Sequence, residues 1–393
     1  MRKRLFAGFA ASVLAAGIMA AVPMTAGADV SITAQPDTSK FEFEKYLIMN
    51  IDATTPNISF DYKIEPVAAA PEGISAGLGG AKFEGDDDTA TVTFATTDET
   101  VLDDNVDKNK TISIDNETNN ERIAIKALTV DLSDVAFTEP GTYRYQITET
   151  TANGTPVVYD TNNVKYLDVI VVNANVLDPN ELKIETVILH NSNTASIAKE
   201  DKVTGFNNKY ITHDLSLDKK ITGNQASKSK YFKFTVKLSN PSGFTPNSND
   251  SFRITGNHDP SVTIGENTYQ NAATVTYSQL KTGLDFYLKG GQSLEINGLP
   301  DGVGYEITED NEDYEPTITV SGDDEDVTAN DEAAKVSDTA LKSSTTVTFT
   351  NLKKGDIPTG VILAVAVPAA LSLVGFIGMV TILIKRRKDN SEG

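Results

Sequence analysis

Two sets of three polar residues, each a lysine, a glutamate and an asparagine, occur in the same order in the two halves of the chain. A neutral lysine amine is a nucleophile, the asparagine side-chain carbonyl is an electrophile, and a protonated carboxyl group can polarise that carbonyl through a hydrogen bond. Attack by the amine, proton transfer through the glutamate and loss of ammonia would leave an amide cross-link. The residues are Lys45, Glu149 and Asn208 in the first set and Lys219, Glu309 and Asn351 in the second.

An internal repeat relates the two sets. Each half has its lysine near the start, its glutamate about two-thirds of the way along, and its asparagine at the end. The glutamates end the segments YQITE and YEITE, and each segment follows a turn that contains proline or glycine. The repeated segments are Phe41–Lys45 with Leu215–Lys219, Tyr145–Glu149 with Tyr305–Glu309, and Phe206–Asn208 with Phe349–Asn351.

Strand geometry predicts where these side chains point. Successive residues of a β-strand face opposite sides of the sheet, so residues two apart share a face. In the first half, Lys45 follows Phe43 at this spacing and Glu149 follows Ile147. The same holds for the other members, so all six are expected on the core-facing side of their strands. Lysine and glutamate are almost never fully buried alone, so each needs a partner there.

Two interpretations of the sets are open from the residues alone. In the first, a Lys–Glu ion pair with an asparagine hydrogen bond occurs twice, or the strand ends extend their charges into solvent. In the second, the residues react, because an apolar pocket shifts lysine toward the neutral amine and glutamate toward the neutral acid. Two sets in the same order, in a chain without cysteine, favour the reaction.

Short alternating segments, separated by clusters of Gly, Asn, Asp and Pro, predict strands through both halves. Many short strands with turn signals between them indicate an all-β protein made of two tandem immunoglobulin-like β-sandwich domains. We assign the first domain to residues 29–210 and the second to residues 211–354. The expected strands include Phe41–Lys45, Ile58–Ile64, Thr142–Thr148, Leu182–Leu189 and Thr274–Tyr277.

Composition excludes several classes of function. With 34 Lys and Arg against 55 Asp and Glu, the formal charge is −21, which argues against binding to nucleic acid or to anionic membranes. The chain has no cysteine, so no disulfide, cysteine thioester or cysteine-based zinc site can form. We interpret the acidic loops 84–88 and 322–331 as solvated turns, with a calcium loop as the alternative. The three histidines are scattered, and neither a metal nor a cofactor is expected.

Both ends of the chain carry processing signals. Residues 1–28 have a basic start, an apolar Ala-rich stretch and small residues before Asp29, as in a signal peptide for Sec export. Near the other end, the sequence Ile357-Pro358-Thr359-Gly360 precedes an apolar run, residues 361–384, long enough to span a bilayer. A basic cluster follows this transmembrane segment and would hold the C-terminus in the cytoplasm.

The C-terminal region, residues 355–393, resembles the cell-wall sorting signal of Gram-positive surface proteins. In that family a sortase cleaves between Thr and Gly and transfers the Thr carbonyl to an amine, here at the Thr359–Gly360 bond. The common motif has one more residue between Pro and Thr, whereas this chain is similar to the shorter Val/Ile-Pro-Thr-Gly form of a class of streptococcal major pilins. The resemblance therefore favours a pilus-specific sortase.

From residue 40 to residue 385 the chain resembles the two-domain streptococcal major pilins of the T-antigen/FctA backbone type. The segments that support this are Pro56–Pro66, Glu139–Tyr143, Leu299–Pro300 and Thr348–Asn351. The resemblance implies one Lys–Asn isopeptide bond in each domain with a glutamate as catalyst. The implied bonds are Lys45–Asn208 with Glu149 and Lys219–Asn351 with Glu309.

The resemblance also implies an acceptor amine shortly before the first-domain asparagine. Lys202 fits this place with a gap of one residue, and Lys199 is the alternative. Thr359 of one subunit would then bond to Lys202 of the next and so build an open fibre. The implied partners are a sortase, identical subunits, accessory pilins and peptidoglycan, with membrane contact only through the C-terminal helix.

We therefore expect a structural backbone subunit of an extracellular pilus on the surface of a Gram-positive bacterium, supporting adhesion. The alternative is a monomeric wall-anchored adhesin that uses the same cross-linked domains as a stalk. A secreted hydrolase is a third class, but no arrangement of a nucleophile with a histidine supports it.

Overall fold

The computed structural model describes residues 39–85, 87–102, 121–151, 156–175, 178–322 and 327–355. The expected signal peptide, the motif Ile357–Gly360 and the segment 361–384 lie outside these ranges. Within them, no helix is both long and apolar enough to cross a membrane. Nearly all regular structure in these ranges is β-strand, which confirms the all-β fold class.

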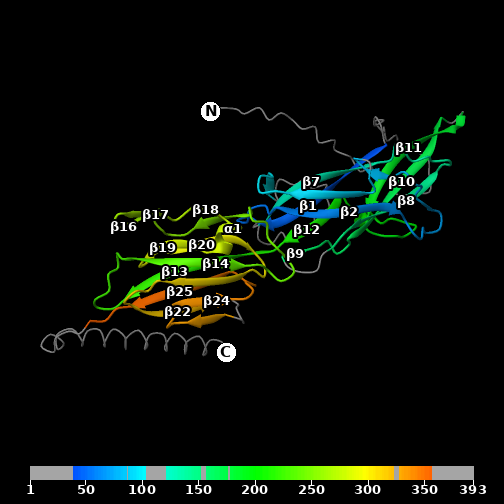
Figure 1. Cartoon of the computed structure of the whole chain (residues 1–393). Coiled ribbons are helices and arrows are strands. Elements are labelled where there is room, and N and C mark those ends of the chain that lie inside the picture. Colours follow the sequence, from blue (N-terminus) through cyan, green and yellow to red (C-terminus); the bar gives the residue numbers. More distant parts are fainter. Residues whose placement is uncertain are drawn as a thin grey trace, which may run out of the picture.

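The first half of the chain forms two facing sheets (Figure 1). One has the strand order β4-β7-β1-β12-β9, with β6 also paired to β7, and the other has the order β11-β10-β8-β2-β5, with β3 paired to β8. The strands are β1 (Lys40–Asn50), β2 (Ile58–Pro66), β3 (Ser75–Ala76), β4 (Lys82–Phe83), β5 (Thr89–Phe94), β6 (Thr100–Leu102), β7 (Glu121–Asp131), β8 (Gly141–Glu149), β9 (Val157–Val158), β10 (Val164–Asn175), β11 (Asp178–His190) and β12 (Gly205–Tyr210).

The second half repeats this architecture. Its sheets have the orders β18-β15-β20-β13-β25-β22 and β19-β14-β21-β24-β23, and β16 and β17 form a separate hairpin. The strands are β13 (Thr212–Thr222), β14 (Tyr231–Ser239), β15 (Ser251–Thr255), β16 (Ser261–Ile264), β17 (Asn267–Gln270), β18 (Thr274–Thr276), β19 (Leu284–Lys289), β20 (Ser293–Pro300), β21 (Gly304–Glu309), β22 (Glu315–Ser321), β23 (Thr328–Asn330), β24 (Lys335–Asp338) and β25 (Thr345–Leu352).

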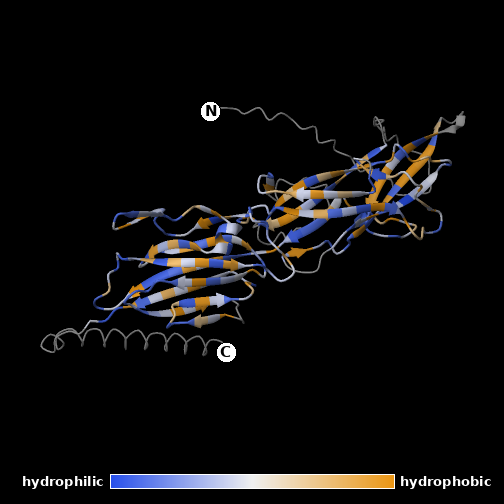
Figure 2. Cartoon of the chain, in the orientation of Figure 1, coloured by the Kyte–Doolittle hydropathy of each residue, from blue (hydrophilic) through white to orange (hydrophobic). Residues whose placement is uncertain are grey.

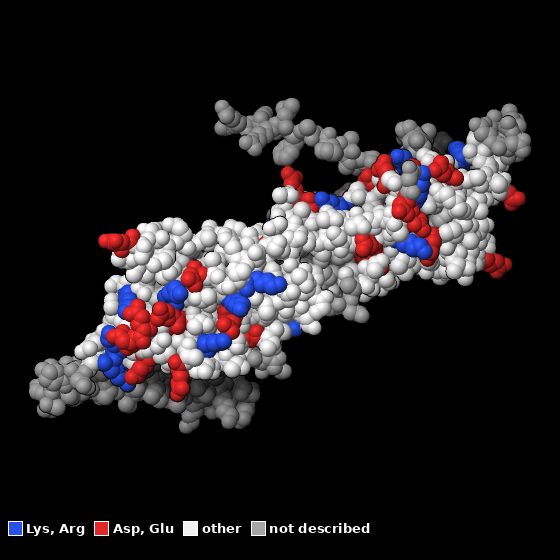
Figure 3. All heavy atoms as spheres, in the orientation of Figure 1, with Lys and Arg blue, Asp and Glu red and all other residues white. Residues whose placement is uncertain are grey.

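Each half has its own apolar core between its two sheets. Apolar and polar residues alternate along the strands in Figure 2, as expected when one face of a sheet is buried and the other is in water. In β14, for example, Phe232, Phe234 and Val236 are buried while the residues between them are more exposed. On the face shown in Figure 3, basic and acidic side chains are interspersed.

In both halves the first and last strands are parallel neighbours. β1 pairs with β12, and β13 pairs with β25. Parallel pairing of strands so far apart in sequence needs a long crossover, which here is the rest of the half. This pairing brings the lysine on the first strand close to the asparagine on the last.

The two halves meet end to end (Figure 1). Asn57 donates through its main-chain N–H and its Nδ2 to Asp250 Oδ1, at 2.7 and 2.8 Å. Gly298 has φ +74°, and a Cβ there would lie 2.6 Å from the Cα of buried Ala53. The junction therefore depends on direct backbone packing as well as on hydrogen bonds.

One predicted strand ends earlier than expected. Thr274–Tyr277 was expected to be extended, but β18 stops at Thr276 and the helix α1 (Tyr277–Thr282) begins there. Thr276 and Gln279 form a capping box, a signal for a helix start that the alternation pattern does not reveal.

Candidate cross-linking sites

The first cluster lies between the two sheets of the first half. Lys45 comes from β1, Glu149 from the end of β8 and Asn208 from β12, and all three are fully buried. Lys45 Nζ donates to Glu149 Oε1 at 2.5 Å, and Asn208 Nδ2 donates to the same oxygen at 3.1 Å. Glu149 Oε1 thus contacts both nitrogens of the expected reaction: Lys45 Nζ, which would form the new amide bond, and Asn208 Nδ2, which would leave as ammonia.

The second cluster has the same construction. Lys219 on β13, Glu309 at the end of β21 and Asn351 on β25 are all buried. Lys219 Nζ lies 2.5 Å from Glu309 Oε1, at ion-pair distance but without the alignment of a hydrogen bond. Asn351 Nδ2 donates to the same oxygen at 2.9 Å.

Strand register shows that the two clusters are equivalent. Lys45 is paired with Phe206, two residues before Asn208, and Lys219 is paired with Phe349, two residues before Asn351. On the facing sheet, Glu149 is paired with Tyr62 and Glu309 with Phe234. The internal repeat found in the sequence therefore corresponds to a repeat in three dimensions.

Burial shifts the lysines toward the neutral amine. Loss of solvation lowers the pKa of Lys45 to about 8, although Glu149 opposes the shift, and it lowers the pKa of Lys219 to about 8 in the same way. The amines also lie over aromatic rings, each 4.4 Å from a ring centroid, of Phe60 and Phe232 respectively. At pH 7 about one amine in ten is then neutral, a far larger fraction than for an exposed lysine.

The carboxyl group of Glu309 is in surroundings that favour the neutral acid. Burial raises the pKa of Glu309. The second oxygens, Oε2 of Glu149 and Oε2 of Glu309, are buried and have no hydrogen-bond partner among the described residues. A buried carboxylate oxygen without a donor is costly, and protonation relieves this cost.

The burial of these residues excludes part of the non-reactive interpretation of the two Lys–Glu–Asn sets. Extension of the charged groups into solvent is excluded, because Lys45 is 0% exposed and Lys219 is 1% exposed. The ion pair with an asparagine hydrogen bond is the arrangement present before any reaction. Chemically, the arrangement allows Nζ to attack the asparagine Cγ, Glu to move a proton to Nδ2, and ammonia to leave as the amide bond forms.

We predict a pH dependence in an Asn208→Ala variant, which keeps the Lys45 amine because the first bond cannot form. The folded-state pKa of Lys45 is about 8 and the ordinary value is 10.5, so above pH 8 the unfolded chain binds more protons. The free energy of unfolding of the first domain should therefore rise with pH, by on the order of 3 kcal/mol in total, as the penalty for a buried charge disappears.

Chemical denaturation at pH 7 to 9.5 measures about 2 kcal/mol of this rise, because the unfolded-state pKa of 10.5 lies above that range. The matched control is a Lys45→Met/Asn208→Ala variant, which retains the tyrosines but not the amine and should lack the rise. Equal pH dependence in the two variants would show that Lys45 titrates normally in the folded protein.

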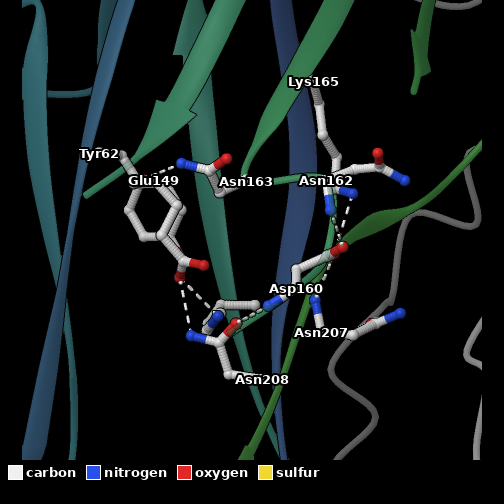
Figure 4. A network of polar contacts seen from close by, with 9 residues as sticks. Tyr62, Glu149, Asp160, Asn162, Asn163, Lys165, Asn207 and Asn208 are labelled. Atoms are coloured by element: carbon white, nitrogen blue, oxygen red, sulfur yellow. Dashed lines mark hydrogen bonds and ion pairs between the residues drawn. The ribbon is translucent and has the colours of Figure 1, made fainter. Parts of the chain in front are cut away.

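Sequence reasoning missed several groups around the first cluster (Figure 4). The Tyr62 hydroxyl donates to Glu149 Oε1 at 2.6 Å. The main-chain N–H of Asp160 donates to Asn208 Oδ1 at 2.9 Å, and the Asp160 carboxylate pairs with buried Lys165. Tyr62 was detectable as a polar residue on the core face of a strand, but Asp160 lies in a loop whose position no periodicity predicts.

The proposed acceptor lysines lie just before β12. Lys199 is exposed and begins the short 3-10 helix Lys199–Asp201, and Lys202 follows it, partly buried and bridged to His190. The other half of the proposed linkage, Ile357–Gly360, lies outside the described residues.

The described residues hold no group of His, Asp and Glu suited to a metal ion. The acidic loops 84–88 and 322–331 are described only in part, because residues 86 and 323–326 fall outside. Of the histidines, His213 lies 2.9 Å from Asp301, which also pairs with Lys342.

Comparisons with known proteins agree with this geometry. Residues 78–211 match the family described as a Spy0128-like isopeptide containing domain, and residues 213–353 match a family described as a domain of unknown function (DUF7601). A curated pilin of Streptococcus pyogenes serotype M1 is 27% identical over 98% of this chain and 99% of its own length. The pilus tip adhesin Cpa of Streptococcus pyogenes is 34% identical over 38% of this chain but only 18% of its own length.

The fold is shared with solved pilins. The crystal structure of the major pilin from Streptococcus pyogenes superposes with a TM-score of 0.54 at 24% identity, covering 81% of this chain and all of that one. Together these findings show that residues 78–211 resemble an isopeptide-containing domain, that the chain is similar over nearly its whole length to a streptococcal pilin, and that it shares the fold of a streptococcal major pilin.

Proposed function

We propose that this chain is a structural protein, the backbone subunit of a surface pilus. In this proposal it closes two intramolecular isopeptide bonds, Lys45–Asn208 and Lys219–Asn351, with Glu149 and Glu309 as the proton-transferring groups. One observation carries the proposal. In both clusters a single buried carboxylate oxygen contacts the lysine nitrogen and the asparagine nitrogen. Each proposed bond joins the first and last strands of its sandwich, so tension across a domain would load a covalent bond instead of ladder hydrogen bonds.

The proposed fibre is linked through Thr359 and Lys202, with Lys199 as the alternative acceptor. β12 runs from this acceptor segment toward the junction, and the chain continues directly into β13. β25 runs parallel to β13 and ends next to Gly355. The acceptor segment therefore lies at the end of β12 away from the junction, and Gly355 follows the end of β25 away from the junction, an arrangement that suits a head-to-tail polymer.

The remaining processing steps belong to the same proposal. Residues 1–28 direct Sec export and are removed, and residues 29–210 and 211–354 are the two domains of the mature subunit. A pilus-specific sortase cleaves at Thr359–Gly360, after the segment 361–384 has held the chain in the membrane. Accessory pilins and peptidoglycan are the further covalent partners.

Co-expression with the cognate pilus sortase tests the linkage. The unmodified chain should give a ladder of polymers on denaturing gels, and Thr359→Ala should give only monomer. Lys202→Ala should also abolish the ladder, because the acceptor amine is lost.

Two lysine variants serve as controls. Lys183→Ala removes an exposed lysine elsewhere in the first domain and should leave the ladder unchanged. If Lys199→Ala abolishes the ladder and Lys202→Ala does not, the acceptor is Lys199. Absence of any sortase-dependent ladder from the unmodified chain would contradict the polymer and support a monomeric wall-anchored stalk.

A further inference from the structure

The two cross-linking sites differ in whether the asparagine carbonyl oxygen accepts a hydrogen bond. In the first site, Asn208 Oδ1 accepts a hydrogen bond from the main-chain N–H of Asp160 at 2.9 Å. We infer that this N–H is an oxyanion donor for the first cross-link, that Lys165 positions it through Asp160, and that the second site works without such a donor. This inference rests on the proposed isopeptide chemistry and adds a positioning residue to it.

The Asp160 loop is held firmly at the cluster (Figure 4). Its carboxylate accepts hydrogen bonds from the main-chain N–H of Asn162 at 2.9 Å and of Asn207 at 3.0 Å. Lys165 Nζ pairs with Asp160 Oδ2 at 2.9 Å and donates to Asn191 Oδ1 at 2.9 Å. Because Asn207 is the neighbour of Asn208, these contacts fix the Asp160 N–H relative to the reacting amide.

The donor lies where charge develops in the reaction. When Lys45 Nζ attacks Cγ of Asn208, the carbonyl π electrons move onto Oδ1, which becomes the oxyanion. Glu149 takes a proton from Nζ and gives one to Nδ2, so that ammonia leaves, the carbonyl re-forms and the amide remains. A fixed N–H donor to the oxyanion typically contributes about 100- to 1000-fold in rate.

The second site has no equivalent donor among the described residues of its domain. Asn351 Oδ1 is buried there without a hydrogen-bond partner. The residue paired with Asn351 on β22 is Pro316, which has no N–H to donate. The two sites thus share the Lys–Glu–Asn chemistry but differ in stabilisation of the oxyanion.

Lys165, Asp160 and Asn191 could themselves be regarded as a third reactive set, since Lys165 is only 1% exposed. Asp160 differs from Glu149 and Glu309, however, because it accepts two main-chain N–H bonds in addition to the lysine. These bonds fix the orientation of the Asp160 carboxylate, so Asp160 is suited to act as an anchor. Detection of a cross-link between Lys165 and Asn191 would contradict the role of Asp160 as an anchor.

The test follows bond formation in the full mature chain during cell-free synthesis, with samples stopped in denaturant at intervals. An internally cross-linked chain migrates differently on a denaturing gel, and peptide mapping identifies the bond. Lys165→Met should slow the first bond about 100-fold or more and leave the second bond of the same chain unchanged. Asp160→Ala removes the carboxylate of the same ion pair and should likewise slow the first bond without changing the second.

Lys183→Met is the matched control, because Lys183 also pairs with a carboxylate in the same sheet but is exposed. It should not change either rate. Normal formation of the first bond in Lys165→Met and Asp160→Ala overturns the inference. Equal slowing of both bonds also overturns it, because this would reflect a general folding defect.

A comparison within the unmodified chain does not depend on whether a variant folds. Peptide mapping at intervals follows the Lys45–Asn208 and Lys219–Asn351 bonds separately in the same chain. The first should form at least about tenfold faster once its domain is complete. Equal rates or the reverse order would overturn the inference, whereas absence of both bonds from the unmodified chain would instead overturn the proposed function.

Discussion

In a Glu149→Ala variant of the mature chain, the first cross-link is expected to be absent while the second still forms. Glu149 Oε1 contacts both Lys45 Nζ and Asn208 Nδ2, so its removal leaves no group to carry the proton from one nitrogen to the other. The intact mass should then lie one ammonia, not two, below the mass calculated from the sequence.

The same variant should be strongly destabilised in its first domain. Lys45 remains buried without its partner, which typically costs about 3–5 kcal/mol. Loss of a cross-link that closes a loop of about 160 residues removes roughly another 5 kcal/mol by the chain-entropy estimate developed for disulfides. The first domain should therefore unfold separately and be cleaved by proteases, while the second domain stays resistant.

Glu309→Ala is the equivalent variant of the second domain. The second bond should be absent, and the first domain should stay resistant to proteases. Glu185→Ala removes an exposed glutamate on β11 and should keep both bonds. Full cross-linking and normal protease resistance in both Glu149→Ala and Glu309→Ala would be incompatible with a catalytic role for these glutamates.

A Gly205→Ala substitution is expected to slow the first cross-link although residue 205 does no chemistry. Gly205 begins β12 and is paired with Glu44 on β1, and a Cβ there would lie 1.7 Å from the Glu44 carbonyl oxygen. Because the obstacle is backbone, β12 must move away from β1 and carry Asn208 with it. A misplacement of about 1 Å can cost about 100-fold in rate, so the first bond should form at least that much more slowly.

Mass spectrometry at intervals after synthesis measures this delay, with the second bond as an internal reference. Gly79→Ala is the matched control, because a Cβ at Gly79 meets no atom within 4 Å. It should leave both bonds unchanged. A Gly205→Ala chain that closes its first bond at the normal rate would show that close approach of β1 and β12 is not needed.

Most of what could be predicted from the sequence followed from the alternation of side chains between the two faces of a strand. Alternation placed Lys45 and Lys219 on core faces, and both are buried there beside a glutamate. The internal repeat predicted two equivalent clusters, because motifs that recur in the same order in both halves are expected to occupy equivalent strands. Whether the bonds form remains a prediction.

Other features could not be predicted, for physical reasons. The parallel pairing of β1 with β12 joins segments separated by most of a domain, and alternation along one strand does not specify its neighbour. The Asp160 N–H is a main-chain group, so its role depends on loop conformation and not on residue type. The need for glycine at 205 likewise arises from the close approach of two strands.

The intact mass of recombinant mature chain, residues 29–359, tests the central claim most directly. We predict a deficit of two ammonia molecules, with peptide mapping that joins Lys45 to Asn208 and Lys219 to Asn351. A mass equal to that calculated from the sequence would contradict the account, because both clusters would then be buried ion pairs.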